Sequence, residues 1–204
     1  MRFAFRARDL LLASWDTEPD RVAGVLPPGL RPAAVDGRHL VSIAAFRAEG
    51  PRLGHLPLPP YSQLNVRAYV EHDGGTAVFF LAARVTALAM GAALLGIPVR
   101  PARLRVRTGA VDAPGLGVSL RYEATAEAEP SDVTGHLAGI YEAAGLRTFT
   151  IRRGEATWRR AEPTQPVRAE PLVALGFDVS RPPELHYAAG ALFEAELPPR
   201  RLSR

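Results

Sequence analysis

The chain has 204 residues and a formal net charge of +4, with 47% hydrophobic and 23% charged residues. This profile is typical of a globular protein, and we expect one domain over residues 1–204. Cysteine and lysine are both absent, so the 25 cationic side chains counted in that charge are all arginine. Disulfides, thiolate metal sites, cysteine nucleophiles and lysine Schiff bases are therefore excluded.

The arginines are interspersed with acidic residues, and no block of them exceeds two residues. This pattern indicates a coding bias toward arginine rather than a nucleic-acid-binding surface, so we expect no nucleic-acid partner. The longest smooth apolar stretch, Ala87 to Val99, is too short to cross a bilayer. Arg2, Arg6, Arg8 and Asp9 interrupt any signal-peptide core near the N-terminus, which argues against a signal peptide. We therefore expect a cytoplasmic protein with no membrane partner.

Three short helices are predicted. The first follows an N-cap at Thr17 and ends before Pro27-Pro28. The second spans Ala87 to Leu95, is apolar on all sides and is expected to be buried. The third runs from Ser131 to Ala144, with apolar residues on one face and Gly145 as its C-cap.

The rest of the chain is predicted mostly as strands, because apolar and polar residues alternate between turn signals. Asp73-Gly74-Gly75 and Arg153-Gly154 are the predicted hairpin turns. The expected strands are His39 to Phe46, Gln63 to Val70, Thr76 to Val85, Arg103 to Thr108, Val118 to Ala126, Arg147 to Ile151, Glu155 to Arg160 and one within Leu185 to Leu197. Many antiparallel strands with about three helices indicate an α+β domain built on a large curved sheet or barrel.

One predicted strand carries the strongest candidate site. Its polar face consists of Gln63, Asn65, Arg67 and Tyr69. In isolation such a face would simply point to water. However, the predicted partner strand, Thr76 to Val85, is apolar on both faces, and a strand of that kind is covered on both faces. The polar face should then also point into an enclosed space, where an arginine needs a carboxylate or an anionic ligand.

Other chemistry is weakly represented in the sequence. Arg103, Arg105 and Arg107 form a second candidate for anion binding, but acidic residues on the next strand favour a solvated, charge-paired surface. The five histidines lack the spacing of a metal site, and no dinucleotide fingerprint or hydrolase elbow is present. We therefore expect no metal and no cofactor.

Several segments occur in a distinctive order along most of the chain. They are Trp15, Leu26-Pro27-Pro28-Gly29-Leu30, Asp36-Gly37, Gln63 to Val70 and Gly96-Ile97-Pro98. In this order they resemble the YqjF-like uncharacterised proteins of the acetoacetate decarboxylase-like superfamily. The resemblance implies a curved, mostly antiparallel sheet that closes into a cone-like barrel around a central cavity, with about three helices packed outside.

The departures from that superfamily concern its chemistry. Acetoacetate decarboxylases carry a Gly-x-Pro-Lys-Lys segment, whose first lysine forms a Schiff base and whose second lowers the pKa of the first. The similar segment here reads Gly96-Ile97-Pro98-Val99-Arg100, so Val99 would stand at the Schiff-base position and Arg100 would keep only a charge. Relatives usually have glutamate where Gln63 stands. The resemblance therefore implies the fold without imine-dependent decarboxylation.

Three functions stay open at this point. The favoured one is binding of a small carboxylate or carbonyl compound in the barrel cavity. The ligand-binding candidates are Gln63, Asn65, Arg67, Tyr69 and, at the entrance, Arg100. The second is an enzyme that acts on a carbonyl substrate by imine-independent acid–base chemistry, with Tyr69, Glu71 or Glu155 as the base. The third is a structural module with a vestigial cavity, forming a homodimer through its sheet edges.

Overall fold

The computed structural model describes residues 1–86, 98–128, 132–135, 138–143, 145–197 and 199–202. Within these residues the helices are short: α1 (Pro19–Ala23), α3 (Asp132–Gly135), α4 (Glu170–Val173) and a 3-10 turn at Pro114–Leu116. The strands are β1 (Arg2–Asp16), β2 (Ala34–Val35), β3 (Arg38–Leu53), β4 (Leu56–Pro57), β5 (Tyr61–His72), β6 (Gly75–Val85), β7 (Val99–Pro101), β8 (Arg105–Arg107), β9 (Ala110–Ala113), β10 (Val118–Glu127), β11 (Ala138–Glu142), β12 (Leu146–Arg153), β13 (Arg159–Pro163), β14 (Arg168–Ala169), β15 (Glu184–Glu196) and β16 (Arg200–Arg201).

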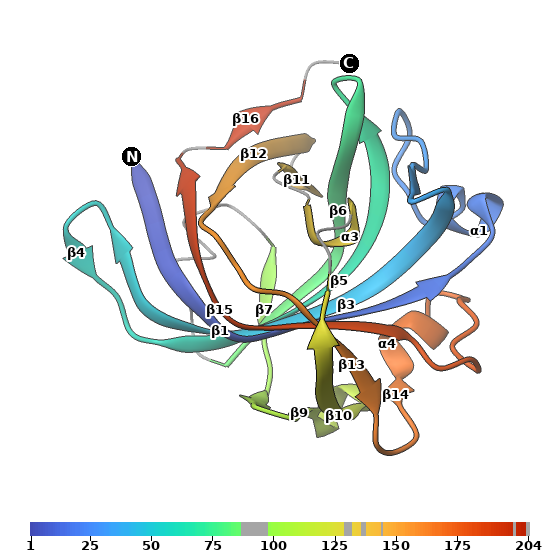
Figure 1. The fold of residues 1–204 in the computed structure, drawn as a ribbon. Coiled ribbons are helices and arrows are strands. Elements are labelled where there is room, and N and C mark those ends of the chain that lie inside the picture. Colours follow the sequence, from blue (N-terminus) through green and yellow to red (C-terminus); the bar gives the residue numbers. More distant parts are fainter. Residues whose placement is uncertain (87–97, 129–131, 136–137, 144, 198, 203–204) are drawn as a thin grey trace.

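Seven strands of the described chain close into a barrel. Their order is β12, β11, β6, β5, β3, β1 and β15, and β15 pairs again with β12. Neighbouring strands run antiparallel except for β6 and β11, which are parallel. Figure 1 shows these strands curving around a common interior. The expected α+β fold, a curved and mostly antiparallel sheet closed into a barrel with few helices, is confirmed.

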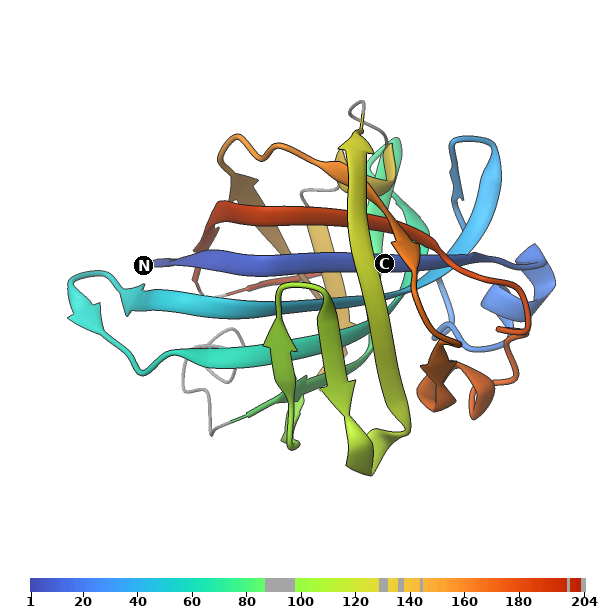
Figure 2. The same ribbon diagram turned by 60° about the horizontal axis from the view of Figure 1, so that its bottom comes forward.

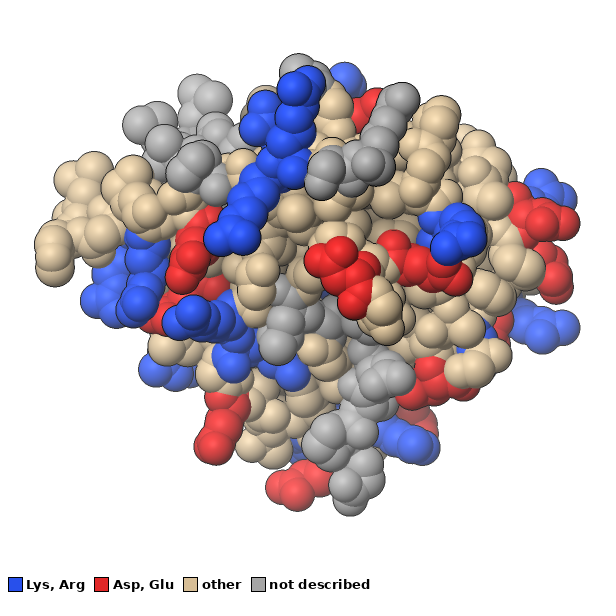
Figure 3. Space-filling view, turned by 90° about the horizontal axis from the view of Figure 1, so that it is seen from above, with Lys and Arg blue, Asp and Glu red and all other residues tan. Residues whose placement is uncertain are grey.

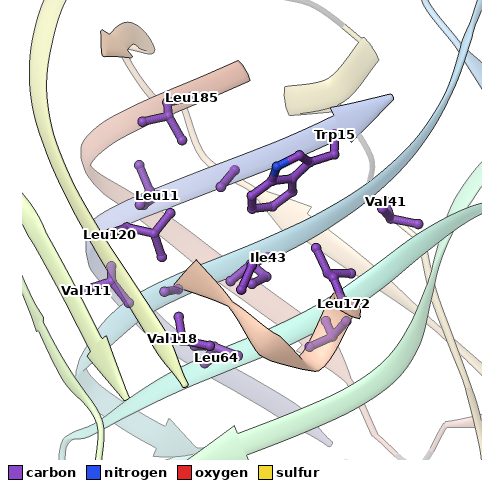
Figure 4. Packing of buried hydrophobic residues seen from close by; sticks show 14 of the residues in the cluster. Leu11, Trp15, Val41, Ile43, Leu64, Val111, Val118, Leu120, Leu172 and Leu185 are labelled. Carbon is purple, nitrogen blue, oxygen red and sulfur yellow. The ribbon is translucent and has the colours of Figure 1, made fainter. Parts of the chain in front are cut away.

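A second layer of strands covers one outer side of the barrel. It branches from β15 through β13 and continues to β10, β9 and β8. Figure 2 shows β10 running across β1 and β3. The space between the two layers is filled by a large apolar core, to which Leu11, Ile43 and Leu64 contribute from the barrel (Figure 4). Leu120 of β10 and Leu172 of α4 close this core from outside.

The alternation of β5 decides what faces the barrel interior. Leu64, Val66 and Ala68 belong to the core between the layers. Successive side chains of a strand point to opposite faces, so the residues between them face inward. The prediction that the polar face of this strand is enclosed is therefore confirmed as a matter of geometry: Gln63 is 6% exposed and Asn65 5% exposed.

The hairpin predicted after this strand is confirmed. β5 ends at His72 and β6 begins at Gly75, which are directly paired. The two residues between them, Asp73 and Gly74, have φ angles of 47° and 74°. Positive φ at both central positions is the requirement of a type I′ turn, whose twist matches that of paired strands. This turn fixes the register in which Arg67 lies opposite Phe80.

The predicted helix from Ser131 to Ala144 is wrong. Within the described part of that range, α3 covers only Asp132–Gly135 and the chain continues as β11. Ile140 and Tyr141 of β11 are fully buried, and both residue types favour strands. Pairing of β11 with β6 also covers a sheet edge that would otherwise be open, so tertiary packing outweighs the helical spacing.

Two further expectations on local structure need correction. The predicted hairpin around Arg153-Gly154 is wrong, because β12 pairs with β11, β15 and β16, whereas β13 pairs with β10 and β15. The first helix is shorter than expected and begins after Glu18 rather than Thr17, without a side-chain cap. The helix predicted over Ala87 to Leu95 lies outside the described residues.

The surface is mixed in charge where it can be seen. Figure 3 shows acidic and basic side chains interspersed on the face that it presents. Arg105 and Arg107 are exposed on β8, at the far end of the second layer. On β10, Arg121 forms an ion pair with Asp112, with 2.8 Å between Nη2 and Oδ1. No helix in the described ranges is long and apolar enough to span a membrane.

A buried histidine makes the stability of this barrel depend on pH. His186 of β15 is 3% exposed and lies opposite Leu12 of β1. Its Nδ1 has no partner among the described residues, and its Nε2 lies 3.5 Å from Oε1 of Glu184. Burial lowers the pKa of His186 below 6.5; Glu184 and Asp36 oppose this shift, while Arg160 and Arg38 add to it.

We expect His186→Gln to reduce the loss of stability on acidification. Because the folded pKa lies below the unfolded value of 6.5, the contribution of neutral His186 is complete above that pH and is lost as pH falls through the folded pKa. The check is the shift in Tm between about pH 7.5 and about pH 5. His55→Gln, at an exposed turn position, is the control. Equal shifts in H186Q and wild type would contradict the assignment.

Candidate functional site

A cavity of about 110 Å³ lies inside the barrel. Strands β1, β3, β5, β6, β11, β12 and β15 contribute to its wall, together with α3 and Trp158. Most lining residues are apolar, and six of them are aromatic: Phe5, Phe46, Phe80, Phe149, Trp158 and Phe193. The polar lining residues are Gln63, Asn65, Arg67, Thr134 and Arg153. An apolar cavity with a few polar groups of this kind is the usual form of a small-molecule site.

Two hydroxyl groups hold Arg67 in a fixed direction. Its Nε donates to Oγ of Ser42 at 3.0 Å, and its Nη2 donates to the hydroxyl of Tyr69 at 3.3 Å. The guanidinium carbon lies 5.8 Å from the centroid of the Tyr69 ring, and the Tyr69 hydroxyl donates to Ser42 at 3.4 Å. No carboxylate among the described residues pairs with Arg67. Its positive charge is therefore oriented but not neutralised by this part of the protein.

The two amides beside Arg67 are joined to each other. Nε2 of Gln63 donates to Oδ1 of Asn65 at 2.8 Å. Oε1 of Gln63 and Nδ2 of Asn65 then have no partner among the described residues, although both side chains line the cavity. The wall of β5 therefore offers one free acceptor and one free donor in addition to the guanidinium.

The other two candidates from the sequence lie elsewhere. Tyr69 is 1% exposed and does not line the cavity. Its hydroxyl instead accepts a hydrogen bond from Arg67. Arg100 of β7 does not line the cavity; with Arg84 and Pro98 it borders a separate hollow of about 300 Å³. Burial lowers the pKa of Arg84, and the charge of Arg100 adds to this effect. The structure thus brings Gln63, Asn65 and Arg67 together and leaves Arg100 apart.

Sequence reasoning missed a second arginine of the cavity wall. Arg153, at the end of β12, has its guanidinium carbon 5.4 Å from the Trp158 ring centroid and donates through Nη1 to the carbonyl oxygen of Thr134. Burial lowers the pKa of Arg153, and no described carboxylate pairs with it. The alternation of Phe149, Ile151 and Arg153 was the available signal, because it places the arginine on the same face as apolar residues.

The proposed catalytic bases do not face the cavity. Glu71 is largely exposed and pairs with Arg31, with 2.8 Å between its Oε2 and Nε. Glu155 is exposed, and the Tyr69 hydroxyl is hydrogen bonded to Arg67 and Ser42. The described part of the lining contains no acidic residue, and the described residues include no cluster of three side chains able to hold a metal. The arrangement is suited to binding an anion.

The fold of this chain is of the acetoacetate decarboxylase-like class. Similar solved structures include an acetoacetate decarboxylase-like enzyme from Sphingomonas wittichii RW1, with TM-score 0.70, 17% identity, and 99% of this chain and 93% of that chain covered. Acetoacetate decarboxylase from Legionella pneumophila has TM-score 0.69 at 11% identity, covering 100% and 88%. The enduracididine biosynthesis enzyme MppR, complexed with pyruvate, has TM-score 0.64 at 13% identity, covering 100% and 91%.

The family follows from the sequence. The profile of DUF2071, described as an uncharacterized conserved protein (COG2071), matches residues 4–191. The chain therefore belongs to the DUF2071 family, as the resemblance to YqjF-like proteins indicated. A search of the curated proteins found no match. The structural neighbours share the fold at identities too low to carry their activities over.

We expect Gly139→Ala to destabilise the barrel by about 1–3 kcal/mol. A Cβ at Gly139 would lie 2.6 Å from Cζ of Phe149 and 2.8 Å from Cε2 of Phe80, so both rings of the cavity wall would have to move. Urea unfolding measures the change in the free energy of unfolding. Gly115→Ala, where an added Cβ meets nothing within 4 Å, is the matched control. An effect in G139A no larger than in the control would show that the rings yield freely.

Proposed function

We propose that this protein binds a small carboxylate-containing molecule in the barrel cavity, with Arg67 as the principal contact. The observation that carries the proposal is that Arg67 lines an apolar cavity, is oriented by Ser42 and Tyr69, and has no carboxylate partner among the described residues. Removing a charge from water costs several kcal/mol unless a partner compensates. A bound carboxylate supplies that partner.

The geometry of the wall is suited to a carboxylate. A guanidinium binds the two oxygens of a carboxylate through parallel hydrogen bonds. Ser42 and Tyr69 occupy Nε and Nη2 of Arg67, which leaves Nη1 and part of Nη2 for the ligand. The free Nδ2 of Asn65 adds a neutral donor on the same face of β5. One similar structure is named as a complex with pyruvate, which is itself a small carboxylate.

The proposed activity is binding without imine chemistry. The chain has no lysine, so no side-chain amine can attack a ketone. Val99, which the resemblance places at the Schiff-base position, is apolar and packs against two apolar clusters of the barrel. The described lining also lacks a carboxylate that could serve as a general base. The described cavity wall thus offers positive charge and hydrogen-bond donors but no carboxylate for acid–base chemistry.

We expect Arg67→Met to weaken carboxylate binding by about 10- to 100-fold, because a charge-assisted hydrogen bond contributes about 1.5–3 kcal/mol. Isothermal titration with 3-phenylpropionate, and with 3-phenylpropionamide as the neutral analogue, measures the dissociation constants. The amide should bind the wild type about as weakly as the acid binds R67M.

The control for this substitution is Arg105→Met, on the exposed face of β8. It removes the same charge from the molecule and leaves the cavity intact, so it should keep the wild-type affinity. Unchanged affinity in R67M, or equal weakening in R67M and R105M, would contradict the proposal.

A further inference from the structure

We infer that the ligand of this cavity is an arylalkyl carboxylate, in which a carboxylate head is joined through a short chain to a flat six-membered ring. The inference rests on the proposed function, which assigns the head to Arg67. It adds the chemical class of the rest of the molecule. The basis is an arrangement of two poles inside the barrel, one at Arg67 and one formed by aromatic rings, separated along β3 and β5.

The positions of the two poles follow from strand register. Arg67 of β5 lies opposite Ser42 of β3, and Gln63 lies opposite Phe46. The backbone positions of Arg67 and Gln63 are four residues apart, which corresponds to about 13 Å at about 3.3 Å per residue. Arg67 donates a hydrogen bond to Tyr69, which lies farther along β5 on the side away from Gln63. The guanidinium of Arg67 is therefore directed away from Gln63. The head and the ring of the ligand are thus held at different levels of the barrel.

The aromatic pole consists of three nearly parallel rings, Phe46, Phe5 and Phe193. The centroid of Phe5 lies 5.4 Å from that of Phe46 and 5.4 Å from that of Phe193, with interplanar angles of 13° and 7°. Phe5 and Phe193 are only partly buried although they belong to the cavity wall. The exposed part of each ring is available to a ligand. A planar ring adds to such a stack in the offset geometry that aromatic pairs prefer.

Phenylalanine is concentrated in the wall of the cavity. Five of the eight phenylalanines of the chain line the cavity. The core between the two layers, by contrast, is built mostly of aliphatic residues, with Phe177 as its one phenylalanine among the described residues. Most of the phenylalanine rings are therefore placed where a ligand can meet them.

Between the two poles, a small side chain in the cavity wall leaves space for a ligand. Ala44 lies between Ser42 and Phe46 on the inner face of β3, opposite Asn65. Its methyl group leaves space that a larger side chain would fill. Asn65 stands at this level with Nδ2 free, next to the position of the carboxylate. A short methylene chain can thus run over Ala44 from the head to the ring.

The second arginine does not require a second carboxylate on the ligand. Arg153 lies opposite Phe193 in register, but its guanidinium stacks on Trp158 and donates to the carbonyl oxygen of Thr134. These contacts occupy part of its surface at the aromatic pole.

The test compares ligands that differ in one feature, using the whole protein and isothermal titration. The probes are 3-phenylpropionate, 3-cyclohexylpropionate, propionate and 3-phenylpropionamide. We expect 3-phenylpropionate to bind at least about tenfold more tightly than propionate, since a buried ring adds both apolar area and stacking. The puckered cyclohexyl analogue should bind more weakly than the flat one. Equal affinities for 3-phenylpropionate and propionate would overturn the inference and leave the proposed function intact.

A pair of variants locates the ring. Phe193→Leu removes one member of the stack and should weaken binding of 3-phenylpropionate by at least about threefold while leaving propionate unchanged. Phe79→Leu, on the face of β6 that belongs to a different apolar cluster, is the matched control and should change neither affinity. Circular dichroism confirms that both variants are folded, and Phe5→Leu provides a second test of the stack.

The outcomes separate the two proposals. Loss of ring preference in F193L but not in F79L supports the assignment of the aromatic pole. A ring preference that both variants keep overturns it, because the ring would then bind elsewhere. If none of the carboxylates binds, or if the amide binds as tightly as the acid, the failure is that of the proposed function itself.

Discussion

The placement of β5 between two enclosed spaces is the constraint on which the rest of the structure depends. Its apolar residues Leu64, Val66 and Ala68 are packed against the second layer of strands, and this fixes its other face toward the barrel interior. A slip of one residue would exchange the two faces and bury Arg67 in an aliphatic core. The large burial between the layers therefore supplies the free energy that holds a guanidinium in the cavity.

The described residues do not neutralise the positive charge of the arginines that line the cavity. Arg67 and Arg153 both line it, and neither has a carboxylate partner there. Structural arginines inside proteins are normally paired, because an unpaired buried charge reduces the stability of the fold. Partial compensation comes from hydroxyls and aromatic faces: Ser42 and Tyr69 for Arg67, and Trp158 for Arg153. Such groups orient a charge without neutralising it, which is the condition for binding an anion.

The chain shows that the shape of this barrel does not depend on lysine side chains. Its backbone resembles that of acetoacetate decarboxylase from Legionella pneumophila at 11% identity, so the closure of the sheet does not depend on particular catalytic residues. In this chain no lysine remains to form an imine, whereas cationic and aromatic side chains line the interior. The fold fixes where a cavity lies, and the side chains on its inner faces determine what it can do.

The sequence by itself determined the strand Gln63 to Val70, its hairpin with β6, and the absence of lysine chemistry, because alternation, an Asp-Gly turn and composition are local or global properties of the chain. It also indicated that Gln63, Asn65 and Arg67 are enclosed. It could not determine that 138–142 forms a strand, because its pairing with β6 decides this and helical spacing competes locally. Alternation along 149–153 puts Arg153 on an apolar face, but only the closure of the barrel by distant strands places it in the cavity and Arg100 outside it. Contacts between strands far apart in sequence carry no local pattern, and only the tertiary structure decided them.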